Sequence, residues 1–171
     1  MKSFALGIAV TLIGLAVGAY AYFATGQAPV ATNAAPMPFE TTLAKMALHA
    51  RIQREMPTAV PIAADETAFV AGVPLYREHC AVCHGLPQQP ETAIASGMFP
   101  KPPQLFHGKG VSDDPAGETY WKVSNGIRLT GMPGFQSSLS DTARWQVSVL
   151  LAHSNQLSPQ VLTLLAAPLP R

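Results

Sequence analysis

The strongest constraint on the fold of this chain is a short motif that holds both of its cysteines. Cys80 and Cys83 are the only two cysteines among the 171 residues, and His84 follows them directly. A disulfide across so short a loop would contribute little, because its effect on stability grows with the length of loop that it closes. The pair therefore indicates a chemical role rather than a cross-link.

The spacing Cys80-x-x-Cys83-His84 is the attachment signature of a c-type haem. Two intervening residues let one helical turn present both sulfurs to one porphyrin edge, and the next residue then reaches the iron. A structural zinc site normally needs four ligands, and the chain has no further cysteine. A thioredoxin-like dithiol expects a βαβ setting, of which the sequence shows no sign. The motif therefore predicts one covalent haem c with His84 as an iron ligand.

A methionine is the expected second axial ligand, because iron in such sites commonly takes a methionine sulfur. Met132 stands in a loop rich in glycine and proline, which can hold a sulfur against a flat ring. We expect the Thr130 hydroxyl to steady this loop by hydrogen bonding. Met98 follows His84 by only fourteen residues and is expected on the histidine side of the ring. His79 is expected to point away from the ring.

The N-terminus carries an uncharged apolar run from Phe4 to Ala24, preceded by Lys2. Such a run is long enough to span a bilayer as a helix. Lys2 favours an orientation with the N-terminus inside and the remainder exported. We interpret residues 1–26 as a membrane anchor. The alternative is a signal peptide cleaved after Gly26, although the apolar region of a signal peptide is normally shorter.

The remaining chain divides into four further segments. Residues 27–38 are rich in alanine and proline and are predicted to be a linker. Residues 39–64 are predicted to hold an amphipathic helix up to Met56 and a connector, with an apolar face formed by Phe39, Leu43, Met46, Ala47 and Ala50. Residues 65–158 are predicted to form the haem domain, and residues 159–171 a C-terminal tail. We interpret the helix that ends at Met56 as a surface helix docked on the haem domain. The alternative is a helix that docks on a partner protein.

Within the haem domain, helices are predicted from caps, periodicity and breakers. Pro74 should kink the first helix or mark its true start. No strand pattern of useful length is visible, which predicts an all-α fold with long loops. The predicted helices run from Asp65 to the haem motif, over 118–125 up to Gly126, from Ser140 to about His153, and from Ser158-Pro159 onward, with mostly loop over 87–115.

The charge pattern excludes one class of partner and weakens another. A net charge of +1 is not typical of a nucleic-acid-binding protein, which normally shows a basic stripe or patch. Residues 65–155 contain six basic and eight acidic side chains, so a lysine-ringed docking face is not evident. Electrostatic steering toward a redox partner is expected to be weak or aimed at a basic patch.

Together these motifs resemble the class I c-type cytochromes, in the monohaem branch related to the haem domains of cbb3-type oxidase subunits. The resemblance implies that the first helix of the haem domain crosses the helix that contains Leu150, and that the small residue Gly72 allows a close approach there. The resemblance is carried by four stretches, namely 71–76 (AGVPLY), 80–85 (CAVCHG), 102–105 (PPQL) and 126–135 (GIRLTGMPGF).

The resemblance implies a class I cytochrome c fold and assigns roles to individual residues. It makes His84 the proximal ligand and Met132 the distal ligand. It implies that the Pro103 carbonyl accepts a hydrogen bond from His84 Nδ1, the kind of contact that orients a metal-bound histidine. Leu105 would pack on the haem face, and Arg128 would lie near a haem propionate.

These features predict a membrane-tethered monohaem cytochrome that carries single electrons rather than an enzyme. Its donor and acceptor would be redox proteins, including a respiratory or dehydrogenase complex. The expected location is the inner membrane of a bacterium, with the haem domain facing the periplasm. The alternative is a haem enzyme or a gas or redox sensor whose sixth coordination site is open or labile.

Overall fold

The computed structural model describes residues 2–167, which form two compact units, one ending at Leu43 and one beginning at Ala44. Over these residues all regular secondary structure is helical, which confirms the all-α prediction. The helices are α1 (Lys2–Ala24), α2 (Glu40–Glu55), α3 (Glu66–His79), α4 (Ala81–His84), α5 (Ala93–Ser96), α6 (Ala116–Asn125), α7 (Asp141–Ala152) and α8 (Pro159–Ala166).

Helix α1 is the one helix within residues 2–167 that is long and apolar enough to cross a membrane. Its 23 residues contain no buried side chain. At a rise of about 1.5 Å per residue it extends roughly 34 Å. The hydrocarbon core of a bilayer is about 30 Å thick, so the length suits a single span.

Three helices of the second unit begin at the residues that the sequence indicates as caps. The side-chain oxygens of Asp65, Ser140 and Ser158 accept hydrogen bonds from the backbone N–H groups three residues further on, at 2.9, 3.1 and 3.2 Å. Each bond satisfies one of the donors that a helix leaves unpaired at its first turn. These caps fix where α3, α7 and α8 start.

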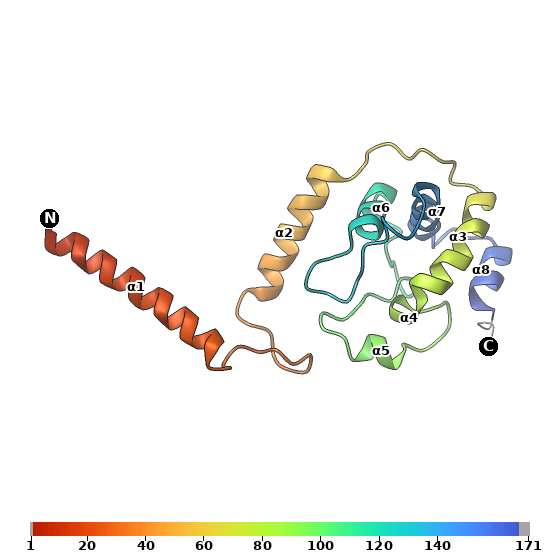
Figure 1. Cartoon of the computed structure of the whole chain (residues 1–171). Helices are drawn as coiled ribbons and strands as arrows, with labels where there is room; N and C mark the ends of the chain where they lie inside the picture. Colours follow the sequence, from red (N-terminus) through yellow and green to blue (C-terminus); the bar gives the residue numbers. More distant parts are fainter. Residues whose placement is uncertain (1, 168–171) are drawn as a thin grey trace. The chain divides into compact units, whose positions relative to one another are not determined.

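The core of the second unit lies where α3 packs against α7 and α8, while α6 packs against α7 (Figure 1). Gly72 of α3 stands at the crossing with α7. A Cβ atom added there would lie 2.7 Å from the carbonyl oxygen of Gln146 and 3.3 Å from Leu150 Cβ. The predicted close approach at Gly72 is therefore present. The fully buried side chains of this core include Tyr76, Val147, Val149, Leu150, Val161 and Leu165.

The structure departs from the predicted helix boundaries in three places. Helix α3 begins at Glu66 and continues through Pro74, so the alternative that Pro74 marks its start is wrong, while a kink at Pro74 stays a prediction. Helix α6 begins at Ala116, two residues before the predicted start. The four-residue helix α5 lies within the segment predicted to be mostly loop, where the sequence indicates no helix.

Helix α2 matches the predicted helix to within one residue at each end, but the predicted apolar face is wrong. Leu43 and Met46 belong to that face and are 56% and 61% exposed. Ile52 is instead the buried residue, at 1% exposure. The helix docks through a face that hydrophobic periodicity does not identify, because polar side chains share it.

Candidate functional site

A cavity of about 370 Å³ lies at the centre of the second unit and is lined mainly by apolar side chains. Helices α3, α4, α6 and α7 and the two long loops all contribute to its wall. Six of the seven predicted site residues line this one cavity: Cys80, Cys83, His84, Pro103, Leu105 and Met132.

The cysteine motif forms a separate helical turn at the end of α3. Helix α3 ends at His79 and α4 begins at Ala81, so Cys80 is the joint between the two helices. Both thiols are free and half-buried. Burial, followed by the charge of Cys83, raises the pKa of Cys80 to about 12, so this thiol is protonated at neutral pH. The motif therefore presents two thiols at one end of the cavity, that of Cys80 in its protonated form.

The imidazole of His84 is held in the orientation that metal binding requires. Its Nδ1 lies 2.8 Å from the Pro103 carbonyl oxygen, which can only accept, so Nδ1 carries the proton and donates. Burial lowers the pKa of His84, against the opposing effect of this hydrogen bond, and so favours the neutral ring. In that tautomer the lone pair of Nε2 is available to a metal. The predicted contact between His84 and Pro103 is present.

Two further hydrogen bonds fasten the segment around Pro103 to the cysteine motif. Gln104 Nε2 donates to the Cys83 carbonyl at 3.0 Å, and the Leu105 N–H donates to the His84 carbonyl at 3.0 Å. Gly85 stands at φ +75°, where a side chain would be strained and would collide with Gln104. Sequence reasoning missed Gln104. Its signal was its place between Pro103 and Leu105 in the stretch that carries the resemblance.

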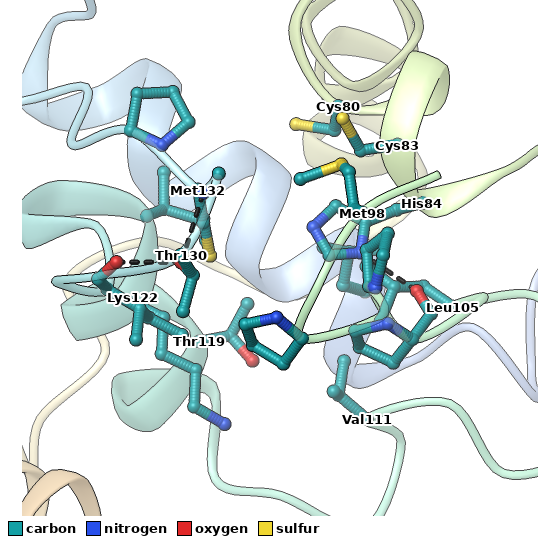
Figure 2. Close-up of a pocket in the computed structure, with 18 of the residues that line it drawn as sticks. Cys80, Cys83, His84, Met98, Leu105, Val111, Thr119, Lys122, Thr130 and Met132 are labelled. Atoms are coloured by element: carbon teal, nitrogen blue, oxygen red, sulfur yellow. Dashed lines mark hydrogen bonds between the residues drawn. The ribbon is translucent and has the colours of Figure 1, made fainter. Parts of the chain in front are cut away.

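The loop that carries Met132 folds back onto α6. The Ile127 N–H donates to the Met132 carbonyl at 3.1 Å. The Thr130 hydroxyl donates to the Ile127 carbonyl at 2.7 Å and accepts from the Met132 N–H at 3.1 Å. The predicted steadying role of Thr130 therefore has its hydrogen bonds. Figure 2 shows Met132 on the opposite side of the cavity from His84.

Met98 lies beside His84 in Figure 2, as predicted, and its methyl group also reaches the Met132 loop at Gly131. His79 does not point away but lines the cavity, with its ring 5.7 Å from that of Phe135. The helix break at Cys80 explains this, because the prediction assumed one continuous helical turn through the motif.

Arg128 is the seventh predicted site residue, and it does not line the cavity. It is exposed, in the segment between α6 and Met132. Its assigned place near a propionate stays a prediction.

The chemistry of this cavity fits a haem c. Two thiols stand beside an imidazole whose Nε2 is free, and a thioether sulfur lies across from them. The wall between them is mostly apolar, as a porphyrin face requires. Thr119 of α6 adds one polar feature. Its side-chain oxygen is buried on the cavity wall and has no hydrogen-bond partner in the part of the chain that the structure describes.

Comparisons with known proteins agree with this geometry. Residues 67–151 match the model of the family described as "Cytochrome C oxidase, cbb3-type, subunit III". A solved structure described as a reducing HAO-like protein complex of Kuenenia stuttgartiensis is similar, with 25% sequence identity and a TM-score of 0.50. The similarity covers 58% of this chain and 49% of that chain, so only about half of the other chain is represented. No curated protein matches.

Proposed function

This chain carries a c-type cytochrome domain of the cbb3-type oxidase subunit III family, and we propose that it is a membrane-tethered carrier of single electrons with His84 and Met132 as axial ligands. The observation that carries the proposal is the placement of these two side chains on opposite sides of one cavity, beside two free thiols (Figure 2). The family implies a covalently bound haem c.

Five residues of the chain hold the haem or orient a residue that does. Cys80 and Cys83 supply the thioether sulfurs, and His84 binds the iron through Nε2 while Pro103 fixes its ring. Leu105 packs on the porphyrin face. The bound haem supplies an iron that alternates between Fe(III) and Fe(II). With a nitrogen and a sulfur ligand in place, no position is left for a substrate, which favours a carrier over an enzyme.

The tether and the charge distribution define the setting that we propose. Helix α1 anchors the protein in the inner membrane of a bacterium, followed by the 27–38 linker and a haem domain, including residues 65–158, in the periplasm. Its partners are redox proteins, a respiratory or dehydrogenase complex among them. The surplus of acidic over basic side chains in residues 65–155 predicts brief docking without a lysine-ringed face.

Far-red absorption of the oxidised holoprotein tests the iron ligands. A Met sulfur on Fe(III) gives a weak charge-transfer band in the far red, and we expect that band in the wild-type protein. Met132→Ala should abolish it. Met98→Ala is the matched control, because Met98 lines the same cavity and should leave the band intact.

Two outcomes would contradict this assignment. If Met98→Ala removes the band and Met132→Ala does not, Met98 is the ligand. A high-spin spectrum with rapid CO binding in the wild-type protein would overturn the carrier and favour the alternative, a haem enzyme or sensor with an open sixth site. The tether is tested separately, because an N-terminus found after residue 26 in the mature protein would show a cleaved signal peptide.

A further inference from the structure

The cavity wall contains one polar group that the ligand set leaves unexplained. Thr119 of α6 is 5% exposed, and its hydroxyl has no hydrogen-bond partner among residues 2–167. Buried hydroxyls in folded proteins almost always have a partner, because leaving one unpaired destabilises the fold. Since Thr119 lines the cavity, the missing partner is a polar group of whatever fills the cavity.

Helix α2 also contributes to this wall, although it lies outside the family domain. Lys45 and Leu48 line the cavity. They share a helix face with Ile52 and Glu55, since all four are spaced by three or four residues. Ile52 is buried, and Glu55 accepts a hydrogen bond from Trp121 Nε1 at 3.2 Å. The face that docks α2 is therefore the same face that reaches the cavity.

The connector that follows α2 packs closely against α6. A Cβ atom added at Gly117 of α6 would collide with the Pro57 carbonyl oxygen. Only a glycine at this position admits the approach. Helix α2 is thus fixed to α6 at its C-terminal end, and Lys45 and Leu48 on its docking face line the cavity.

The three lysines that line the cavity differ in their partners. Lys101 Nζ pairs with Glu91 at 2.8 Å, and Lys122 Nζ pairs with Glu118 at 2.6 Å. The Lys45 ammonium group has no hydrogen bond and no carboxylate within 4.0 Å among the residues described, so its charge is available to the occupant of the cavity.

The orientation of a haem in this cavity follows from its covalent chemistry. The vinyl groups that react with cysteines and the two propionates lie at opposite edges of the porphyrin. Figure 2 shows Thr119 across the cavity from Cys80 and Cys83. The propionate edge therefore faces α6 and the helix docked on it. We propose that Thr119 and Lys45 form the propionate-binding end of the site, so that α2 contributes a haem-binding residue to the pocket.

Charge and burial divide the roles of the two residues. Thr119 donates its hydroxyl proton to a propionate oxygen in the buried part of the wall. Lys45 is exposed, so it pairs with the propionate at the solvent edge and contributes as much as a surface ion pair does. This inference requires haem in the cavity, as the proposed function does, but it requires neither Met132 as ligand nor electron transfer.

The test compares charge-removing and conservative variants of the full-length holoprotein. Lys45→Gln should lower the midpoint potential at pH 8, because losing a cation near the haem favours Fe(III). The strength of an exposed pair predicts a change of about 1.5- to 5-fold in the Fe(II)/Fe(III) ratio, or about 10–40 mV at 59 mV per tenfold. Resonance Raman bands of propionate bending should shift in Lys45→Gln and in Thr119→Val.

The controls separate a propionate contact from a general effect on the fold. Lys45→Arg and Thr119→Ser keep the charge and the hydroxyl and should retain wild-type values. Arg54→Gln removes a charge from α2 about 2.5 turns after Lys45, on the opposite face, and should change neither readout. If Lys45→Gln and Thr119→Val both leave the potential and the Raman bands unchanged, the inference is wrong. The far-red band of each variant reports independently on Met132.

Discussion

A buried hydroxyl of Tyr76 ties the helix before the haem motif to the residue after it. Tyr76 is fully buried, and its hydroxyl donates to the Gly85 carbonyl at 2.6 Å. Its ring meets Phe106 edge-on at 5.1 Å. Tyr76→Phe keeps the ring contact and leaves the Gly85 carbonyl without this donor, in a place that water does not reach. The substitution therefore isolates one hydrogen bond.

The expected loss of stability follows from the removal of this one hydrogen bond. A buried acceptor without its donor costs about 1–3 kcal/mol, and the more apolar phenylalanine offsets part of this. We expect the free energy of unfolding to fall by about 1–2 kcal/mol and the Tm by about 4–8 °C. Urea denaturation of the holoprotein, followed by haem absorption and far-UV circular dichroism, measures the change.

Tyr120→Phe is the matched control for this experiment. The Tyr120 hydroxyl donates to Asp141 near the surface, and its ring stacks on Trp145, a contact that phenylalanine keeps. Removing this exposed bond should cost less than about 0.5 kcal/mol. Equal losses in the two variants, or a change below about 0.3 kcal/mol in Tyr76→Phe with the denaturant slope unchanged, would refute the reasoning.

Three further predictions concern the loop, the docked helix and alkaline pH. Thr130→Val leaves the Met132 N–H unpaired at a cost of about 1 kcal/mol, so imidazole should displace the sulfur with about fivefold higher affinity; unchanged affinity would contradict this. Gly117→Ala should lower the free energy of unfolding by about 1–3 kcal/mol in urea titrations, because its Cβ collides with the Pro57 carbonyl. Burial raises the pKa of Tyr76 far above its ordinary value, so the folded state retains a proton that the unfolded chain releases above about pH 10. Stability should then fall by at most about 1.4 kcal/mol per pH unit above pH 10, and less steeply in Tyr76→Phe.

Local chemistry explains which parts of the fold the sequence predicts. Asp65, Ser140 and Ser158 cap helices because each can satisfy an N–H donor within its own turn, so the neighbouring residues suffice to identify them. The motif at Cys80 is equally local. Helix α5 spans only four residues, too few for a periodic pattern, and the sequence does not indicate it.

The unpredicted features of the candidate site depend on contacts between distant segments. His79 lines the cavity because the chain breaks its helix at Cys80 and packs His79 on Phe135 from another loop. Met98 reaches Gly131 only because the two long loops meet. Neither contact leaves a periodic or cap signal, so only the packed structure reveals it.

The limits of the family domain are narrower than those of the folded unit. The family model ends at residue 151, yet Val161 and Leu165 of α8 are completely buried against the core. Arg77 of α3 donates to the Leu164 carbonyl at 2.6 Å. On the N-terminal side of the family match, Ile52 is also buried, although the match begins only at residue 67. A fragment cut at 67–151 would expose these apolar surfaces and lose Lys45 and Leu48 from the cavity wall, so a fragment that retains the whole site must include α2 and α8.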